Sequence, residues 1–309
     1  MKEFKIKSIV KAVFFPLVWL RRQYLHYYTL WEGKHHPKKL ASKWYKNAMG
    51  KDLDWDDPKD LNEKINWMKF NTDLSEWTRL SDKYRVREYL KERGREDLLV
   101  ELYGVWENAD DIDFDALPNK FVLKSNHGCG TVILVNDKST LDIPCVRKKM
   151  NNWIKSSYGI LTVEPQYLKI KPLLIAEELL ENDNPNSSSL IDYKVFCVEG
   201  EVYCIMVCAN RTIGKGMETM LYDTEWNPKP EMLAGTHVHD KVCISKPSCL
   251  DELLKAAKDL SKGHHFVRAD FYISKGKVYF GEMTFTPKGG YTDTVSYQHL
   301  LKMGSMVKL

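Results

Sequence analysis

Alternating apolar and polar positions near the C-terminal end of the chain predict a β-hairpin. Two runs rich in aromatic and β-branched residues, Phe266–Ile273 and Val278–Phe285, flank a short Lys-Gly-Lys turn. Asp270 lies on the first run and Glu282 on the second. A three-residue loop would place these two carboxylates opposite each other, whereas a two-residue loop would place them on opposite faces of the sheet.

The charges on this hairpin suggest a site for magnesium and phosphate. Arg268 shares the face of Asp270, because side chains two residues apart in a strand point to the same side. Both carboxylates are embedded among aromatic residues, and buried carboxylates are rare unless they are paired or bind a metal. Magnesium takes one or two protein carboxylates and completes its shell with water and phosphate oxygens. The alternative is a surface hairpin with solvated charges.

Apolar residues at helical spacing predict four helices, over Leu61–Phe70, Leu80–Glu92, Met150–Ser157 and Leu250–Lys262. Asp60 is the expected N-cap of the first helix. The second helix is expected to be capped by Ser81 or Asp82 and closed by Gly94, with most of its charges on a solvated face.

Further apolar runs predict strands over Phe121–Lys124, Val132–Val135 and Pro172–Leu180, and a second hairpin over Tyr193–Val198 and Val202–Val207. The stretch Thr212–Asp240, which includes His237 and His239, is expected to be irregular.

A glycine-rich loop, SNHGCGT at residues 125–131, joins the first two of these strands. It is therefore neither a Walker loop nor a dinucleotide-binding fingerprint, because both of those lead from a strand into a helix. Lys124 ends the first strand, in position to meet a phosphate that the backbone amides of the loop would cover. His127 is placed to contact the same phosphate, and the alternative is an exposed loop histidine.

Charge is distributed unevenly along the chain. Residues 1–51 contain twelve Lys and Arg against Glu3 and Glu32, a balance of +10, whereas the whole chain carries +4. The apolar run Ala12–Leu20 lies in this basic segment, but Pro16 interrupts it and it is shorter than the roughly twenty residues that span a bilayer. The segment fits a helix lying on an anionic membrane surface, and the alternative is a helix that packs on the protein's own domain. No recognised nucleic-acid motif accompanies the charge, so nucleic acid is not an expected partner.

Composition indicates a globular protein of the reducing cytoplasm. The 309 residues are 43% hydrophobic and 12% aromatic, enough for one large domain or two smaller ones. The seven cysteines are an odd number and form no CxxC pair, which argues against a disulfide framework and against a zinc site.

The motifs together form an ordered pattern. Lys124 before a glycine-rich loop, a strand ending in Glu177-Glu178, DYKVF, and RADF followed by GEMTFTP resemble the ATP-grasp superfamily. LNEKINWMKFN, LSDKYRVREYL and LPNKFVLKSNHGCG are similar to its TupA-like branch, which is associated with teichuronopeptide and capsular polysaccharide biosynthesis. The resemblance extends from roughly Leu61 to the C-terminus.

This resemblance implies an α+β, ATP-grasp fold in which two α+β subdomains clasp ATP, preceded by a helical N-terminal region. Its implied boundaries are a basic and apolar segment at 1–50, a helical region at 51–118 and the ATP-grasp domain at 119–309. Within that domain, 119–178 would cover the nucleotide and 179–309 would hold the metal and the acceptor.

The resemblance also implies roles for residues that bind ATP. Lys124 would bind the α- and β-phosphates, and Asp192 would bind the ribose. The glycine-rich loop would close over the phosphates through Ser125, Asn126, His127, Gly128 and Gly130. The adenine would be held at the hinge by Glu177, Glu178, Leu179 and Leu180.

Asp270 and Glu282 would hold Mg²⁺, and Arg211 and Arg268 would neutralise the transferring phosphoryl group, with Lys194 as a further phosphate contact. The family commonly reads Glu-x-Asn at the second acidic strand, whereas this chain has Thr284 in the last position. A threonine hydroxyl is a poorer magnesium ligand than a carboxamide oxygen. Either Thr284 acts through water, or a second ion is weakly held.

The implied reaction is activation of a carboxylate by ATP, followed by attack of an amine to give an amide, ADP and phosphate. The carboxylate would be a uronic acid of a surface polysaccharide or its precursor, and the amine an amino acid or other amine. The protein would act in the cytoplasm, with contact to the inner membrane surface. Two alternatives share these motifs: a kinase of the same fold that phosphorylates a sugar or lipid hydroxyl, and a non-catalytic nucleotide-binding component of capsule assembly.

Overall fold

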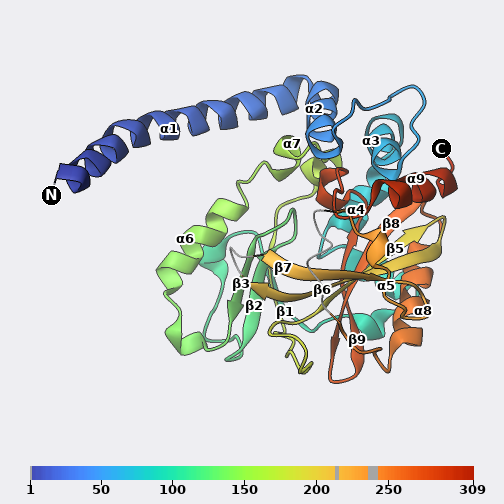
Figure 1. Cartoon of the computed structure of the whole chain (residues 1–309). Helices are drawn as coiled ribbons and strands as arrows, with labels where there is room; N and C mark the ends of the chain where they lie inside the picture. The colour runs from blue at the N-terminus through green and yellow to red at the C-terminus, as the bar shows by residue number, and fades with distance from the viewer. Residues whose placement is uncertain (1, 213–215, 236–242) are drawn as a thin grey trace.

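The strands of the protein form two antiparallel sheets. The computed structural model describes residues 2–212, 216–235 and 243–309. A four-stranded sheet has the order β1-β4-β2-β3 and a five-stranded sheet the order β7-β6-β5-β8-β9 (Figure 1). Helices surround both sheets, so the predicted α+β class is confirmed.

The four-stranded sheet consists of β1 (Leu102–Trp106), β2 (Phe121–Ser125), β3 (Val132–Val135) and β4 (Leu174–Glu177). β1 lies in the region 51–118, for which only helices were expected. Helix α6 (Ile143–Trp153) packs on this sheet through Val146 and Met150. It begins earlier than predicted, because Asp142 caps its N-terminus by accepting a hydrogen bond from Cys145 N at 3.0 Å. It also ends earlier, at Trp153 rather than Ser157.

The five-stranded sheet consists of β5 (Asp192–Val198), β6 (Glu201–Thr212), β7 (Gly216–Tyr222), β8 (Phe266–Ser274) and β9 (Lys277–Thr284). The two predicted hairpins are therefore present. The prediction of an irregular stretch after residue 212 was wrong for β7, which pairs with β6 at the edge of the sheet. His237 and His239 lie outside the described residues.

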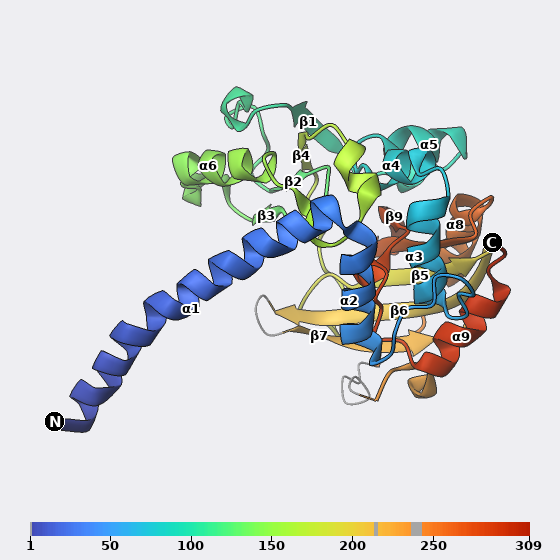
Figure 2. The same cartoon turned by 90° about the horizontal axis from the view of Figure 1, so that it is seen from above.

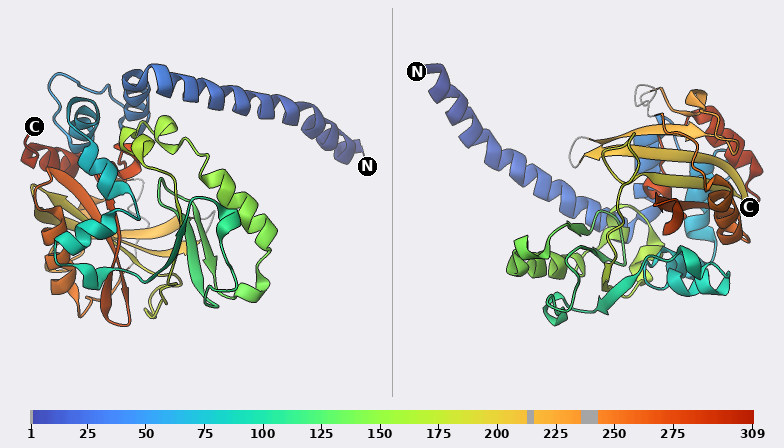
Figure 3. Two further views of the ribbon diagram at one scale, coloured as in Figure 1. Left: turned by 180° about the vertical axis from the view of Figure 1, so that it is seen from behind. Right: turned by 90° about the horizontal axis from the view of Figure 1, so that it is seen from below.

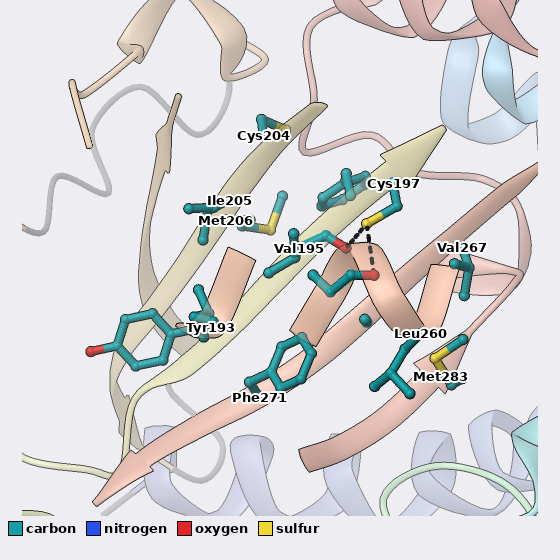
Figure 4. Packing of buried hydrophobic residues seen from close by; sticks show 14 of the residues in the cluster. Tyr193, Val195, Cys197, Cys204, Ile205, Met206, Leu260, Val267, Phe271 and Met283 are labelled. Atoms are coloured by element: carbon teal, nitrogen blue, oxygen red, sulfur yellow. Dashed lines mark hydrogen bonds between the residues drawn. The ribbon is translucent and has the colours of Figure 1, made fainter. Parts of the chain in front are cut away.

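One face of the five-stranded sheet is covered by α8 (Leu250–Ser261) and forms the main core. Tyr193, Val195 and Cys197 of β5 point to this face together with Phe271 of β8 (Figure 4). The Cys197 thiol lies 3.8 Å from the carbonyl oxygen of Val195 and 3.9 Å from that of Ala257 in α8. Because side chains alternate along a strand, the residues between these core positions point to the opposite face.

Three further helices stand beside this sheet: α2 (Pro37–Met49), α3 (Leu61–Asn71) and α9 (Tyr297–Met306) (Figure 2). The short helix α7 (Tyr158–Leu161) contacts α1 and the 3₁₀ helix Pro165–Lys169. Helix α3 begins as predicted, with Asp60 and Glu63 forming a reciprocal capping box. Short 3₁₀ helices complete the described chain at Glu96–Leu98, Ala109–Asp111, Lys138–Thr140, Pro165–Lys169, Pro230–Met232 and Pro287–Gly289.

The single helix predicted over Leu80–Glu92 is instead two helices, α4 (Ser75–Ser81) and α5 (Val86–Glu92). The break follows Asp82, whose carboxylate accepts hydrogen bonds from the backbone of Tyr84 at 2.9 Å and of Arg85 at 3.2 Å. Such local side-chain bonds compete with helical ones. Gly94, the predicted stop, follows α5 with a φ of +66°.

Helix α1 (Lys2–His35) extends away from the rest of the protein (Figures 1 and 3). Large apolar side chains between Val18 and Trp31 are exposed along it. The alternative expectation, a helix that packs on the protein's own domain, stays open for the apolar run Ala12–Leu20, because the side chains before Val18 lie outside those that the structure describes. Within the described part of the chain, no helix has the length and apolar character needed to cross a membrane.

Candidate active site

Strand pairing brings the predicted phosphate and metal residues into one row. Lys194 of β5 lies opposite Asp270 of β8, and Asp270 lies opposite Glu282 of β9. Arg268 and Thr284 form the adjacent cross-strand pair. Directly opposed residues have neighbouring side chains, so three adjacent strands supply one continuous charged surface on the sheet.

The hairpin reaches this arrangement in a way that loop length alone did not predict. Ser274 pairs with Lys277, so the loop has two residues, and Lys275 and Gly276 both have positive φ, as a type I′ turn requires. The pairing then shifts by one residue between Phe271 and Asp270. The inference that a two-residue loop separates the carboxylates was wrong, because this β-bulge absorbs the extra residue, Gly281, and returns Glu282 to the position opposite Asp270.

Asp270 is almost completely buried, with 2% of its surface exposed, and its charge is matched by two cations. Arg268 donates from Nε to Oδ1 at 2.6 Å and from Nη2 to Oδ2 at 2.7 Å. Lys194 Nζ donates to Oδ2 at 2.6 Å. Burial disfavours the charged form of Lys194, but the charges of Asp270 and Asp192 together outweigh that effect, and the pKa of Lys194 is raised. Lys194 and Arg268 are thus both held in their charged forms next to Asp270.

Glu282 is the more accessible carboxylate, with 35% of its side chain exposed. The Thr284 hydroxyl donates to its Oε1 at 3.2 Å, and Arg268 Nη2 lies 3.6 Å from the same oxygen. Burial opposes ionisation of Glu282, but the charges of Lys83, Lys194 and Arg268 outweigh it and lower the pKa to about 2. Glu282 is therefore ionised at neutral pH.

Lys83, which the sequence analysis missed, links this row to the glycine-rich loop. It lies at the break between α4 and α5, and its Nζ donates to the carbonyl oxygen of Gly128 at 2.7 Å. The same Nζ lies 3.6 Å from Glu282 Oε2. Lys83 thus contacts both the glycine-rich loop of the four-stranded sheet and Glu282 of the five-stranded sheet. The sequence alone did not single out Lys83, because it is one of several charged residues in the helix predicted over Leu80–Glu92, most of whose charges were expected to face solvent.

The first residues of the glycine-rich loop shape the loop itself. Asn126 is fully buried, donates to Asp82 Oδ1 at 3.0 Å and to Lys171 O at 2.9 Å, and accepts from Leu173 N at 2.7 Å. The Ser125 hydroxyl is also buried and lies 2.6 Å from that of Thr131. These two side chains are therefore engaged in holding the loop.

His127 is buried, so the alternative of an exposed loop histidine was wrong. Its Nδ1 lies 3.2 Å from Asn126 Oδ1. Burial, followed by the nearby charge of Lys83, lowers the pKa of His127, which therefore stays neutral at pH 7. Gly128 and Gly130 follow it in the loop, so Asn126 to Gly130 lie between β2 and β3, whereas Ser125 is the last residue of β2.

Lys124, at the end of β2, forms an ion pair with Glu177 of β4. Arg87 of α5 also pairs with Glu177, with Nη1 3.4 Å from Oε1. To bind phosphate, Lys124 must leave Glu177, and Arg87 would then balance the charge of Glu177. Glu178, Leu179 and Leu180 follow β4 as a half-buried segment, the predicted hinge.

Asp192, at the start of β5, pairs with Arg211 of β6. Lys194 Nζ lies 3.8 Å from Asp192 Oδ1 and also holds Asp270, so it joins the predicted ribose-binding acid to the predicted metal-binding acid. Arg211 is half exposed, and its side chain can turn toward a ligand.

The donor set fits magnesium bound together with a nucleotide. No group of three or more His, Cys, Asp or Glu side chains within the described ranges could hold a metal ion alone. Asp270 and Glu282 suffice when water and phosphate oxygens complete the shell. Each carboxylate oxygen has two lone pairs, so Asp270 can keep its contacts to Arg268 and Lys194 while it binds an ion.

Comparison with known families gives one match, which covers most of the chain. The family model TupA-like ATPgrasp matches residues 63–308. The chain belongs to the TupA-like ATP-grasp family. The resemblance noted in the sequence is thereby confirmed, and so is the fold that it implied. A search of curated proteins found no match.

A search of solved structures matched this TupA-like protein to several ligases at low sequence identity. D-alanine–D-alanine ligase from Bacillus anthracis in complex with ATP is 15% identical, with a TM-score of 0.45 over 74% of this chain and 65% of that chain. The ATP-grasp ligase PsnB, complexed with a phosphomimetic variant of its minimal precursor, Mg and ADP, is 13% identical, with a TM-score of 0.40 over 80% of this chain and 66% of that chain. The TupA-like chain thus spans about two thirds of each ligase.

Proposed function

We propose that this protein is an ATP-dependent carboxylate–amine ligase that joins an amine or amino acid to a uronic acid of a surface polysaccharide or its precursor. The observation that carries the proposal is the row of Lys194, Asp270 and Glu282, with Arg268 and Lys83 beside it, in a member of the ATP-grasp family. Phosphoryl transfer needs positioning and charge neutralisation rather than a covalent nucleophile.

In this reaction an oxygen of the substrate carboxylate attacks the γ-phosphorus of ATP, and ADP leaves. The amine nitrogen then attacks the carbonyl carbon of the acylphosphate. Phosphate leaves with the original carboxylate oxygen, and the nitrogen loses a proton.

The residues divide this work by position. Lys124 would hold the α- and β-phosphates once it leaves Glu177. Arg268 and Lys83 would neutralise the transferring phosphoryl group, since both lie within 3.6 Å of Glu282. Bound magnesium would neutralise phosphate charge at Asp270 and Glu282, which have the oxygen ligands it prefers.

Isotope transfer tests the proposal directly. The substrate would be a glucuronate-containing oligosaccharide labelled with ¹⁸O in its carboxylates, with a mixture of amino acids as the amine source. A ligase moves one labelled oxygen into the released phosphate and makes ADP release depend on the amine. A kinase gives ADP and a phosphorylated sugar without labelled phosphate, and a non-catalytic component binds nucleotide without ADP release; either result would refute the ligase.

A matched pair of variants links the outcome to this site. Asp270→Asn should abolish label transfer. Lys91→Met, which changes an exposed lysine of α5 paired with Glu96 at 3.2 Å, should leave it intact.

A further inference from the structure

The described part of α1 carries an aromatic surface that the catalytic site does not use. Leu20, Tyr24, Tyr27 and Trp31 are 55%, 67%, 66% and 50% exposed. Soluble domains rarely leave so many large apolar side chains uncovered in one place, and such patches mark interaction sites.

These four residues lie on one side of the helix. Their spacing of four, three and four residues keeps them within about 60° of each other at 3.6 residues per turn. Tyr28 joins this aromatic face, with its ring 6.1 Å from that of Tyr24 and 6.2 Å from that of Trp31. Further exposed apolar side chains, Val18, Trp19 and Leu25, lie elsewhere around the same helix.

The last turn of α1 fixes this surface relative to the protein. Glu32 is buried and lies 3.7 Å from Lys39 and 3.6 Å from Lys43 in α2. Gly33 packs so closely on Ile160 of α7 that a Cβ at Gly33 would lie 2.4 Å from Ile160 O. Helix α1 leaves the domain at this turn and continues outward (Figures 1 and 3). The aromatic face begins there, because Trp31 directly precedes Glu32.

We propose that the aromatic face of α1 docks the protein on an anionic phospholipid surface. Tyrosine and tryptophan suit the boundary between headgroups and acyl chains, because their rings are apolar and carry a polar group. Helix α1 itself, residues 2–35, carries seven Lys and Arg against Glu3 and Glu32, a balance of +5, and Arg21 and Arg22 lie within the exposed stretch, so the helix also matches an anionic surface in charge.

Docking of this kind goes beyond the proposed ligase activity. It would hold the domain next to the membrane through α2 and α7, which contact the last turn of α1. The acceptor substrate could then be carried on a membrane lipid, and a soluble acceptor would still be processed.

The test uses the full chain and two kinds of vesicle, phosphatidylcholine alone and phosphatidylcholine with phosphatidylglycerol. Co-sedimentation should show binding to the anionic vesicles at 0.1 M NaCl and weaker, residual binding at 1 M, because salt shortens the Debye length from roughly 10 to 3 Å. Tyr24→Ser/Tyr27→Ser/Trp31→Ser should lower partitioning by about tenfold or more. Arg21→Glu/Arg22→Glu should lower it at 0.1 M salt and change little at 1 M.

A matched control carries three exposed leucines that lie elsewhere: Leu134→Ser/Leu168→Ser/Leu309→Ser, at positions that are 58%, 53% and 50% exposed. It should bind vesicles like the wild type. The proposal is overturned if the wild type does not bind anionic vesicles, or if the aromatic variant binds as well as the control. It is also overturned if sedimentation velocity finds a stable dimer that the aromatic variant splits while vesicles stay unbound. Should the aromatic variant unfold, the salt dependence of the arginine variant decides.

Discussion

Lys83 offers the sharpest test of how the site is assembled. Lys83→Met keeps most of the apolar stem and removes the charge that contacts Gly128 O at 2.7 Å and Glu282 at 3.6 Å. We expect this change to weaken nucleotide binding, because the carbonyl of the glycine-rich loop loses its charged donor and the phosphates lose a nearby cation.

The magnitude follows from the two contacts. A hydrogen bond from a charged donor is worth roughly 1.5–3 kcal/mol, and the lysine side chain is only 16% exposed. The ion pair to Glu282 adds about 1 kcal/mol at most, since that carboxylate is 35% exposed and solvent screens it. A loss of about 2 kcal/mol corresponds to roughly 30-fold weaker binding.

The assay is calorimetric titration of a non-hydrolysable ATP analogue with magnesium, together with thermal unfolding to verify the fold. Lys91→Met is the matched control, because Lys91 of α5 is 57% exposed and pairs only with the exposed Glu96 of the following 3₁₀ helix among the ion pairs of the described residues. A folded Lys83→Met protein that binds nucleotide as tightly as the wild type would refute this role for Lys83. Equal losses in the two variants would show that the effect is not specific to the site.

Four further predictions concern other parts of the molecule. Lys124→Ala should mainly weaken ATP binding, whereas Arg268→Ala should mainly lower turnover, by roughly 10²–10³-fold, because Arg268 would face charge that develops in the transition state. Nucleotide titration and steady-state kinetics of both variants test this, and equal losses of binding would show that the roles are wrongly assigned. Gly281→Ala should lower the free energy of unfolding by about 1–3 kcal/mol in urea titration, because its Cβ would lie 3.0 Å from Asp270 O; an unchanged midpoint would contradict that close contact. Burial lowers the pKa of His264 from 6.5 to about 4, so the unfolded chain binds more protons between these values and the free energy of unfolding falls as the pH drops through this window. That loss is at most about 3 kcal/mol, and urea titrations at several pH values should show a flatter dependence in His264→Gln; an equal slope would refute the assignment. Chelation of magnesium with EDTA should abolish ADP release and added Mg²⁺ should restore it, whereas persistent ADP release would exclude a magnesium requirement.

Local patterns predicted most of the strands and helices. The hairpin strands, the Asp60 cap and the glycine-rich loop were all legible from alternation, spacing and turn residues. β7 was missed, because an edge strand that follows a long partner needs no strong pattern of its own.

Long-range contacts explain the remaining differences. The break between α4 and α5 depends partly on Asp82, whose carboxylate also accepts from Asn126 at 3.0 Å, 44 residues away. Lys83 meets Gly128 across 45 residues, and no local pattern separates it from a solvated lysine. The grouping of Arg268, Asp270 and Glu282 was predictable because all three belong to one hairpin.

The bulge at Gly281 also affects how related chains should be recognised. Phe271 pairs with Phe280 on one side of it and Asp270 with Glu282 on the other. A chain without this one glycine would keep both pairs in an uninterrupted ladder and would lose only the local bend. A search pattern that fixes the number of residues between the two acids would reject such a chain, although its carboxylates would still face each other. An alignment gap in this hairpin therefore belongs at the bulge, and pairing identifies the site better than spacing does.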